Sequence, residues 1–147
     1  MSLLTRPVRD EDIGTCVSIF IDTFSRSPWN EHWDHGVVHS RLKQILDTPL
    51  SFGLIIENAS PIGFALGFSE PWHQGNHFYL KEMCIHSDFQ RQGFGTHLMN
   101  DLITSLKERD TRKIYLLTAR GDLSESFYAK LGFYTSPKMI MMAQHLK

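Results

Sequence analysis

The segment Gln90–Thr96 has the residue types of a phosphate-binding loop. It reads Gln-Arg-Gln-Gly-Phe-Gly-Thr and leads into an apolar ladder typical of a helix. Glycines at positions 93 and 95 let a ligand approach the backbone closely, because no Cβ stands in the way. A helix start offers unpaired N–H groups and the positive end of its dipole, and Arg91 adds a permanent cation. We therefore predict an anion site, most naturally for phosphate; the alternative is a glycine-rich packing turn.

Two well-known phosphate motifs do not describe this loop. The dinucleotide fingerprint requires a third glycine where this chain has Leu98, and the G-K-[ST] of a P-loop is absent.

The stretch Met83–Gly95 resembles the acetyl-coenzyme A segment of the GNAT N-acetyltransferases, whose loop reads Q/R-x-x-G-x-G/A. The family's second block is recognisable in the run Phe-Tyr-Ala-Lys-Leu-Gly-Phe at residues 127–133. The resemblance implies an α/β (α+β) GNAT fold, with a mixed sheet of about six to seven strands flanked by about four helices. It also implies a splayed strand beside the acetyl-CoA site.

The same resemblance implies the donor-binding residues. The pantetheine arm would pair with the main chain of Met83, Cys84 and Ile85. The pyrophosphate would lie in the loop formed by Arg91, Gln92, Gly93, Phe94, Gly95 and Thr96. The family transfers acetyl directly to the amine, which favours Cys84 as a small buried thiol over Cys84 as a nucleophile.

Two residues are candidates for proton transfer. Tyr128 matches the family position of a general acid for the leaving thiolate; the alternative is a core tyrosine. Glu82 is the only carboxylate on the strand beside the coenzyme, which makes it the candidate base; the alternative is a structural carboxylate that anchors a neighbouring element. Strict strand alternation would turn Glu82 away from the face of Tyr79 unless a local irregularity rotates it.

The acceptor residues are expected between the first two helices and on the strand before the loop. Trp29, Glu31, Trp33 and Tyr79 are the candidates. Trp faces attract cations and carboxylates add complementary charge, so a cationic amine with apolar parts would suit them. The alternative is a loop that its tryptophans pin to the core. Histidines at 32, 35 and 39 share a helical spacing, but no carboxylate or cysteine completes a ligand set, so we expect no metal.

Apolar spacing predicts the elements that position these residues. Spacings of three and four indicate helices from Ile13, from Val38, and from Phe94 to Leu106. Strand-like runs cover residues 3–8, 52–56, 62–68 and 77–85, a buried strand is expected at 114–117, and two closing strands at 133–134 and 139–142. The D-x-x-E spacing of Asp122 and Glu125 predicts a capping box before a short helix.

The composition indicates one domain over residues 1–147. The chain has 15 basic and 16 acidic residues, so its balanced charge gives no field that recruits nucleic acid. No apolar run approaches the roughly 20 residues that span a bilayer, and we expect a cytoplasmic protein without membrane contact. The methionines at 139, 141 and 142 would suit a homodimer interface or the edge of a core.

The sequence therefore predicts an enzyme that moves acetyl from acetyl-CoA to a primary amine in a ternary complex. A small aminoglycoside-, polyamine- or amino-compound-like acceptor is favoured, because no charged run suggests a peptide groove. The alternatives are a protein or peptide N-acetyltransferase and a non-catalytic acyl-CoA-binding sensor.

Overall fold

The computed structural model describes residues 3–147, which separate into two compact units, residues 3–116 and Leu117–Lys147. The first unit contains the sheet and three α-helices. In chain order its elements are β1 (Leu3–Pro7), α1 (Ile13–Phe24), α2 (His35–Asp47), β2 (Ser51–Asn58), β3 (Ser60–Trp72), β4 (Gly75–Ile85), α3 (Phe94–Glu108) and β5 (Thr111–Tyr115). The second unit contains α4 (Leu123–Lys130).

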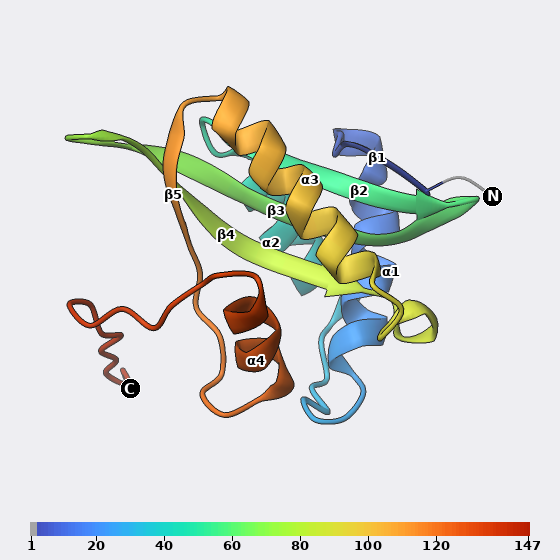
Figure 1. Ribbon diagram of the computed structural model, residues 1–147. Helices are drawn as coiled ribbons and strands as arrows, with labels where there is room; N and C mark the ends of the chain where they lie inside the picture. Colours follow the sequence, from blue (N-terminus) through green and yellow to red (C-terminus); the bar gives the residue numbers. More distant parts are fainter. Residues whose placement is uncertain (1–2) are drawn as a thin grey trace. The chain divides into compact units, whose positions relative to one another are not determined.

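The sheet has the strand order β1-β2-β3-β4-β5. The first four strands pair antiparallel as a meander, and β5 joins β4 in parallel after the crossover through α3. This mixed sheet with helices on both sides is the α/β architecture that the sequence predicts (Figure 1).

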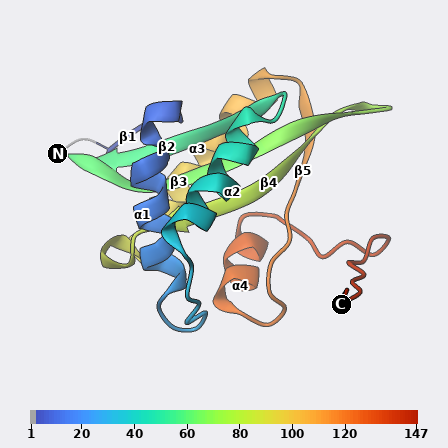
Figure 2. The ribbon, with the colours of Figure 1, turned by 180° about the vertical axis from the view of Figure 1, so that it is seen from behind.

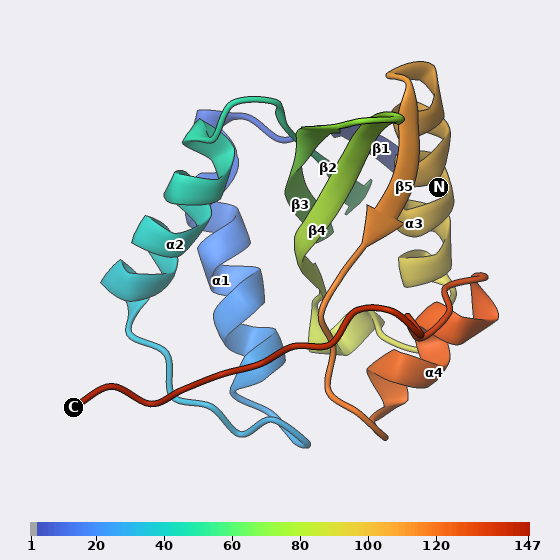
Figure 3. The same cartoon turned by 90° about the vertical axis from the view of Figure 1, so that its left-hand side faces the viewer.

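Helices cover both faces of the sheet in the first unit. Figure 3 shows α1 and α2 on one side and α3 on the other, and Figure 2 gives the view onto α1 and α2. The apolar stripes of α1 and α2 bury against Ile55, Phe64 and Leu66 of the sheet. On α3 the ladder residues Leu98, Leu102 and Leu106 are buried, the first two at 0% exposure, and Phe94 at the start of the helix is half-buried. The predicted helices are thus confirmed, and each one buries the stripe from which it was predicted.

A β-bulge interrupts β4 at Lys81. Gly67 lies opposite Leu80, whereas Leu66 lies opposite Glu82, so Lys81 has no partner in this register. Gly67 is required here because a Cβ would collide with the main-chain oxygen of Tyr79. The bulge changes which side chains share a face of the strand.

The two predicted closing strands are wrong, and the sheet has five strands over the described residues rather than six to seven. Residues 133–134 and 139–142 form no strand. The Met139 N–H donates to the Ser136 hydroxyl over 3.0 Å, which is a local turn around Pro137 rather than a ladder contact. The Lys138 N–H donates to the same hydroxyl over 3.3 Å, so the run starts in a turn rather than in a ladder.

Two local predictions also need correction. The strand expected at 114–117 lies earlier, at Thr111–Tyr115, and its residues are half-buried or exposed rather than buried. Leu117 lies beyond the strand and is 60% exposed. Asp122 occupies the N-cap position of α4 but makes no side-chain cap. Glu125 instead accepts from the Gly121 N–H over 2.6 Å, so the carboxylate at the third helical position caps alone.

Candidate functional site

The strand β4 outruns β5 where the sequence predicts a splay. Pairing between them runs from Asn76–Thr111 to Tyr79–Tyr115, and β5 ends there while β4 continues to Ile85 (Figure 3). We call residues 80–85 the β4 edge. It leads directly into the segment that carries the two glycines.

Alternation along the ladder decides which main-chain groups of the β4 edge point away from β3. The His86 N–H donates to Ile62 O over 2.8 Å, so His86 belongs to a hydrogen-bonded pair. Counting back along an antiparallel ladder, Cys84 directs its main-chain groups to β3, whereas Met83 and Ile85 direct theirs to the opposite side. Of the three residues predicted to line the pantetheine arm, Met83 and Ile85 thus have the matching backbone direction.

Cys84 lies in the core between β4 and α1. Its side chain is 2% exposed, and burial raises the pKa of its thiol well above the usual value. A buried thiol that stays protonated is a poor nucleophile. The geometry therefore agrees with the structural interpretation of this cysteine.

The glycine loop has the backbone that its sequence predicts. Gly93 has φ +86°, and a Cβ added there would meet nothing within 4 Å. The Gly93 carbonyl accepts the first helical hydrogen bond of α3, from His97 N–H at 3.0 Å. The N–H groups of Phe94, Gly95 and Thr96 accordingly form the first turn, whose donors have no partner within the helix. Arg91 and Gln92 are exposed beside them, so this loop can receive an anion.

Helix α1 fixes the far end of the β4 edge. The Thr23 hydroxyl, which donates to Ile19 O at 2.8 Å, also lies 3.2 Å from Ile85 O, and Asp22 accepts from the Ser87 N–H over 2.9 Å. Burial alone would raise the pKa of Asp22, but hydrogen bonds from Ser87 and Arg26 outweigh it and the pKa is lowered. The ionised carboxylate thus ties α1 to the segment that leads into the glycine loop.

Glu82 is held by a cation that sequence reasoning did not identify. Arg41 of α2 donates to the Glu82 Oε1 atom through Nη2 at 2.7 Å and Nε at 2.9 Å. The Glu82 side chain is 7% exposed and that of Arg41 39%. Burial raises the pKa of Glu82, and the attraction of Arg41 offsets only part of that rise; Lys81 lowers it slightly and Glu31 raises it slightly. The carboxylate therefore anchors α2 to β4 and also has a pKa closer to neutrality.

The bulge brings Tyr79 onto the face of Glu82. Tyr79 lies opposite Phe68 with ring centroids 5.9 Å apart, and Phe68 packs against the core under α1 and α2. Glu82 lies opposite Leu66, which belongs to the same core. The obstacle expected from strict alternation is thus removed by the extra residue Lys81, whose Nζ lies 4.9 Å from the centre of the Tyr79 ring.

The predicted acceptor tryptophans are engaged within the protein. Trp33 packs edge-on against Phe20 at 5.1 Å, donates from Nε1 to Glu31 at 2.8 Å, and has the Arg41 guanidinium 5.9 Å from its ring centre. Trp29 packs against Phe24 at 5.1 Å. The cation over the Trp33 face is thus the protein's own Arg41, in line with the alternative of a loop pinned to the core.

Tyr128 lies on α4 in the second unit. Its ring packs against Phe127 at 5.2 Å and Phe133 at 5.5 Å. These contacts fix the ring within the Phe-Tyr-Ala-Lys-Leu-Gly-Phe segment.

Among residues 3–147 there is no group of three or more His, Cys, Asp or Glu side chains that could hold a metal ion. Residues 32, 35 and 39 are exposed histidines. No helix within the described part of the chain is long and apolar enough to cross a bilayer.

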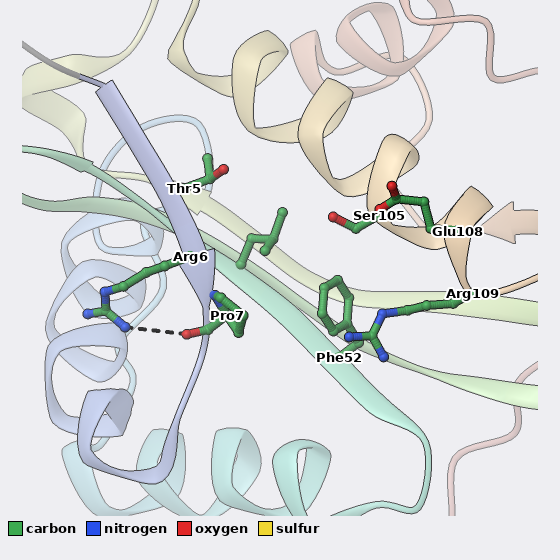
Figure 4. A pocket seen from close by; sticks show the side chains of 8 residues that line it. Thr5, Arg6, Pro7, Phe52, Ser105, Glu108 and Arg109 are labelled. Carbon is green, nitrogen blue, oxygen red and sulfur yellow. Dashed lines mark hydrogen bonds between the residues drawn. The ribbon is translucent and has the colours of Figure 1, made fainter.

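A separate pocket of about 460 Å³ lies between β1, β2 and the end of α3 (Figure 4). None of its lining residues belongs to the predicted site. Its two cations are already engaged, because Arg6 pairs with Asp12 and Glu57, and Arg109 lies 4.0 Å over the ring of Phe52. We therefore assign no reaction to this pocket.

Arg41 and Asp22 are the two residues that sequence reasoning missed. Arg41 had a signal: it stands next to Leu42 and three residues after Val38, on the flank of the buried stripe of α2. A cation beside a buried stripe is seldom covered by protein unless a carboxylate pairs with it. Asp22 had no comparable signal, since nothing in the residues around it indicates that its carboxylate faces Ser87.

Comparison with known proteins agrees with this geometry. The model of the Acetyltransferase (GNAT) family matches residues 17–133 of the chain. A curated relative, "Uncharacterized N-acetyltransferase CgeE" of Bacillus subtilis (strain 168), is 33% identical over 73 residues. That match spans 50% of this chain and 27% of the relative.

Two solved structures share the fold. A possible acetyltransferase from Clostridium difficile 630 is similar with a TM-score of 0.83 and 14% identity over 100% of both chains. An aminoglycoside N-acetyltransferase solved in complex with CoA has a TM-score of 0.76 and 14% identity, covering 99% of this chain and 96% of the other.

Proposed function

Because this chain belongs to the acetyltransferase (GNAT) family, we propose that it transfers the acetyl group of acetyl-CoA to a primary amine of a small molecule. The observation that carries the proposal is the β4 edge, which continues past β5 and runs into a glycine loop at the start of α3. Such an arrangement offers main-chain partners for an extended amide-bearing arm and N–H donors for a phosphate within one continuous stretch.

The donor would be held mainly by main-chain groups. Met83 and Ile85 have the backbone direction to pair with the pantetheine amides. Ile85 would do so through its N–H, because its carbonyl already accepts from the Gln90 amide over 2.8 Å. The first turn of α3 would take the pyrophosphate. Arg91, exposed on the loop, would neutralise part of its charge. When bound, acetyl-CoA supplies an activated acetyl group, which leaves the thioester sulfur for the amine nitrogen with loss of one amine proton.

Two side chains of this chain are proposed to move protons. An alkylamine with a pKa of about 10.4 is mostly protonated at pH 7, so a base must take a proton before attack. We assign this to Glu82, whose raised pKa suits that task, directly or through one water. Tyr128 would protonate the departing thiolate; this role rests on the family motif at residues 127–133.

The acceptor class is proposed to be a small amine rather than a protein. One structural neighbour is an aminoglycoside N-acetyltransferase, which supports a small-molecule amine without fixing its identity. We further propose that residues 1–147 act as one domain in the cytoplasm, without nucleic acid. A homodimer through the exposed methionines 139, 141 and 142 is part of the same proposal.

Calorimetric titration with acetyl-CoA tests the donor site directly. Gly93→Ala introduces a Cβ that meets nothing in the free protein, so a loss of affinity reports a ligand against the loop. Gly121→Ala is a strain-matched control, since its φ is +83° and its Cβ space is equally open. We expect about tenfold weaker binding in the first variant, the cost of about 1.4 kcal/mol, and little change in the second. Equal binding in all three proteins, or none in the natural chain, would refute the proposed donor site.

Thiol release during incubation with a panel of amines tests the transfer itself. Free CoA thiol that appears only with an amine present supports the reaction. Tight acetyl-CoA binding without amine-dependent thiol release would favour the non-catalytic acyl-CoA-binding alternative instead.

A further inference from the structure

The acceptor side of the first unit contains a half-exposed arginine in place of the cation-binding surface that the sequence suggests. The face of Trp33 is covered by Arg41, and the carboxylate of Glu31 is bonded to the Trp33 indole. Asp34 is used as well, because it caps α2 by accepting from the Val37 N–H over 3.2 Å. Each of these groups therefore already makes a contact within the protein.

Arg41 has hydrogen-bonding capacity left after pairing with Glu82. A guanidinium carries five N–H donors in a planar fork, and the two bonds to Glu82 use Nε and Nη2, which lie along one edge. The other edge, formed by Nη1 and the second hydrogen of Nη2, has the spacing of a carboxylate. Because 39% of the side chain is exposed, part of Arg41 remains open to solvent.

The position of Arg41 relative to the proposed base defines what kind of acceptor would fit. Arg41 and Glu82 are in direct contact, so an acceptor whose amine approaches Glu82 brings its neighbouring atoms against Arg41. In an α-amino acid the amine and the carboxylate are separated by a single carbon. Tyr79 and Trp33 lie on the same side and would contact an apolar or aromatic side chain of the acceptor.

We propose that Arg41 is a specificity-determining residue, which binds a carboxylate adjacent to the acceptor amine through its second guanidinium edge. The inference rests on the proposed acetyl transfer and narrows its acceptor from amines in general to α-amino acids and related amines with a neighbouring carboxylate. It makes a polycation without a carboxylate, such as spermidine, a poorer acceptor, because such a molecule offers no partner for the second edge of Arg41.

Matched amine pairs test the role of Arg41. Phenylalanine with phenylalaninamide and leucine with leucinamide differ only at the carboxylate, and spermidine serves as the polycation. Kd is measured by calorimetry on CoA-saturated protein, and kcat/KM by thiol release with acetyl-CoA. The natural chain should favour each acid over its amide by about tenfold or more, the worth of a charged hydrogen-bonded pair.

Arg41→Lys provides the matched variant. Lysine keeps a positive charge near Glu82 but has no planar fork, so α2 stays anchored while the bidentate edge is lost. Preference for the acid should fall by about tenfold, and binding of the amide should stay the same. Circular dichroism melts of the variant confirm that it is folded before selectivity is compared.

The outcomes separate the two proposals. Thiol release with spermidine or the amides at least as fast as with the acids overturns the role of Arg41 and leaves acetyl transfer standing. An acid preference that Arg41→Lys does not reduce also overturns it, as does the absence of acid binding. Acid-selective binding without thiol release from any amine overturns the transfer reaction and supports the Arg41 site as a binding site only.

Discussion

Removal of the Arg41 guanidinium should destabilise the protein in a pH-dependent way. Arg41→Met leaves the Glu82 carboxylate, only 7% exposed, without its cation. Breaking a fully buried pair costs about 3–5 kcal/mol and an exposed pair about 0.2–1 kcal/mol. Because Arg41 is 39% exposed, we expect an intermediate loss of about 2 kcal/mol at pH 7, or about 4–8 °C in Tm.

The sign of the pH dependence follows from the raised pKa of Glu82. A carboxyl with a higher pKa in the folded than in the unfolded protein loses stability as the pH rises between those two values. Arg41 lowers the pKa of Glu82 against the effect of burial, so its removal raises that pKa further and widens this window. Below about pH 4 the carboxyl is protonated in both states, and the charge-dependent part of the loss should vanish.

Thermal melts of the variant at pH 7 and pH 4 measure this effect. Arg41→Met/Glu82→Gln, which removes both charges, should recover most of the stability at pH 7. Lys43→Met is a control on the same helix, because it breaks only exposed contacts, with Asp47 at 2.7 Å and Asp10 at 3.3 Å, and should lower Tm far less. A variant as stable as the natural chain at pH 7, or one equally destabilised at both pH values, would refute the reasoning.

Three further predictions concern donor binding and chemistry. Tyr128→Phe should lower kcat by about 10²-fold or more and leave the Kd for acetyl-CoA unchanged. Steady-state kinetics measure the first quantity and calorimetry the second. An unchanged kcat at saturating substrate would contradict the role of Tyr128 as the acid. Cys16 and Cys84 should not react with an Ellman-type reagent at pH 8 until the protein unfolds, because both thiols are buried. Burial raises the pKa of Cys16 to about 12 and also raises the pKa of Cys84. Fast labelling of the native protein would contradict this prediction. Asp22→Asn should weaken acetyl-CoA binding more than it lowers Tm, because it loosens the contact that holds Ser87 before the loop. Arg26→Met removes an exposed partner of the same carboxylate and should change neither the Kd for acetyl-CoA nor Tm. Calorimetry and thermal melts measure both quantities.

The parts of the fold that the sequence predicts well are those set by local periodicity. The stripes of α1, α2 and α3 are spaced at three and four residues, and each lies against the sheet as expected. The glycine loop was predictable for a related reason, since Gly93 at φ +86° needs a residue without a Cβ. The failures lie in the second unit, where apolar runs without a ladder partner were expected to be strands.

The acceptor side could not be predicted because its contacts are long-range. Arg41 and Glu82 are 41 positions apart, and the residues around each of them do not indicate that the other is its partner. The bulge at Lys81 also cannot be recognised from alternation, because buried and half-buried residues of β4 alternate regularly on both sides of it. Only the register against β3 shows that Tyr79 and Glu82 share a face.

This bulge links the two halves of the proposed reaction. Without the bulge, Lys81 would pair with Leu66 and Glu82 with Ala65, so Glu82 would turn to the α3 side of the sheet and Arg41 on α2 could not reach it. With it, one strand presents main-chain groups of Met83 and Ile85 along its edge and the Glu82 carboxylate on its face. A donor lying along the edge and an acceptor approaching the face would then meet at β4. The rigidity of that meeting point comes from Arg41 on one side and from the contacts of Asp22 and Thr23 on the other. Loss of either anchor should therefore impair transfer even where the donor still binds.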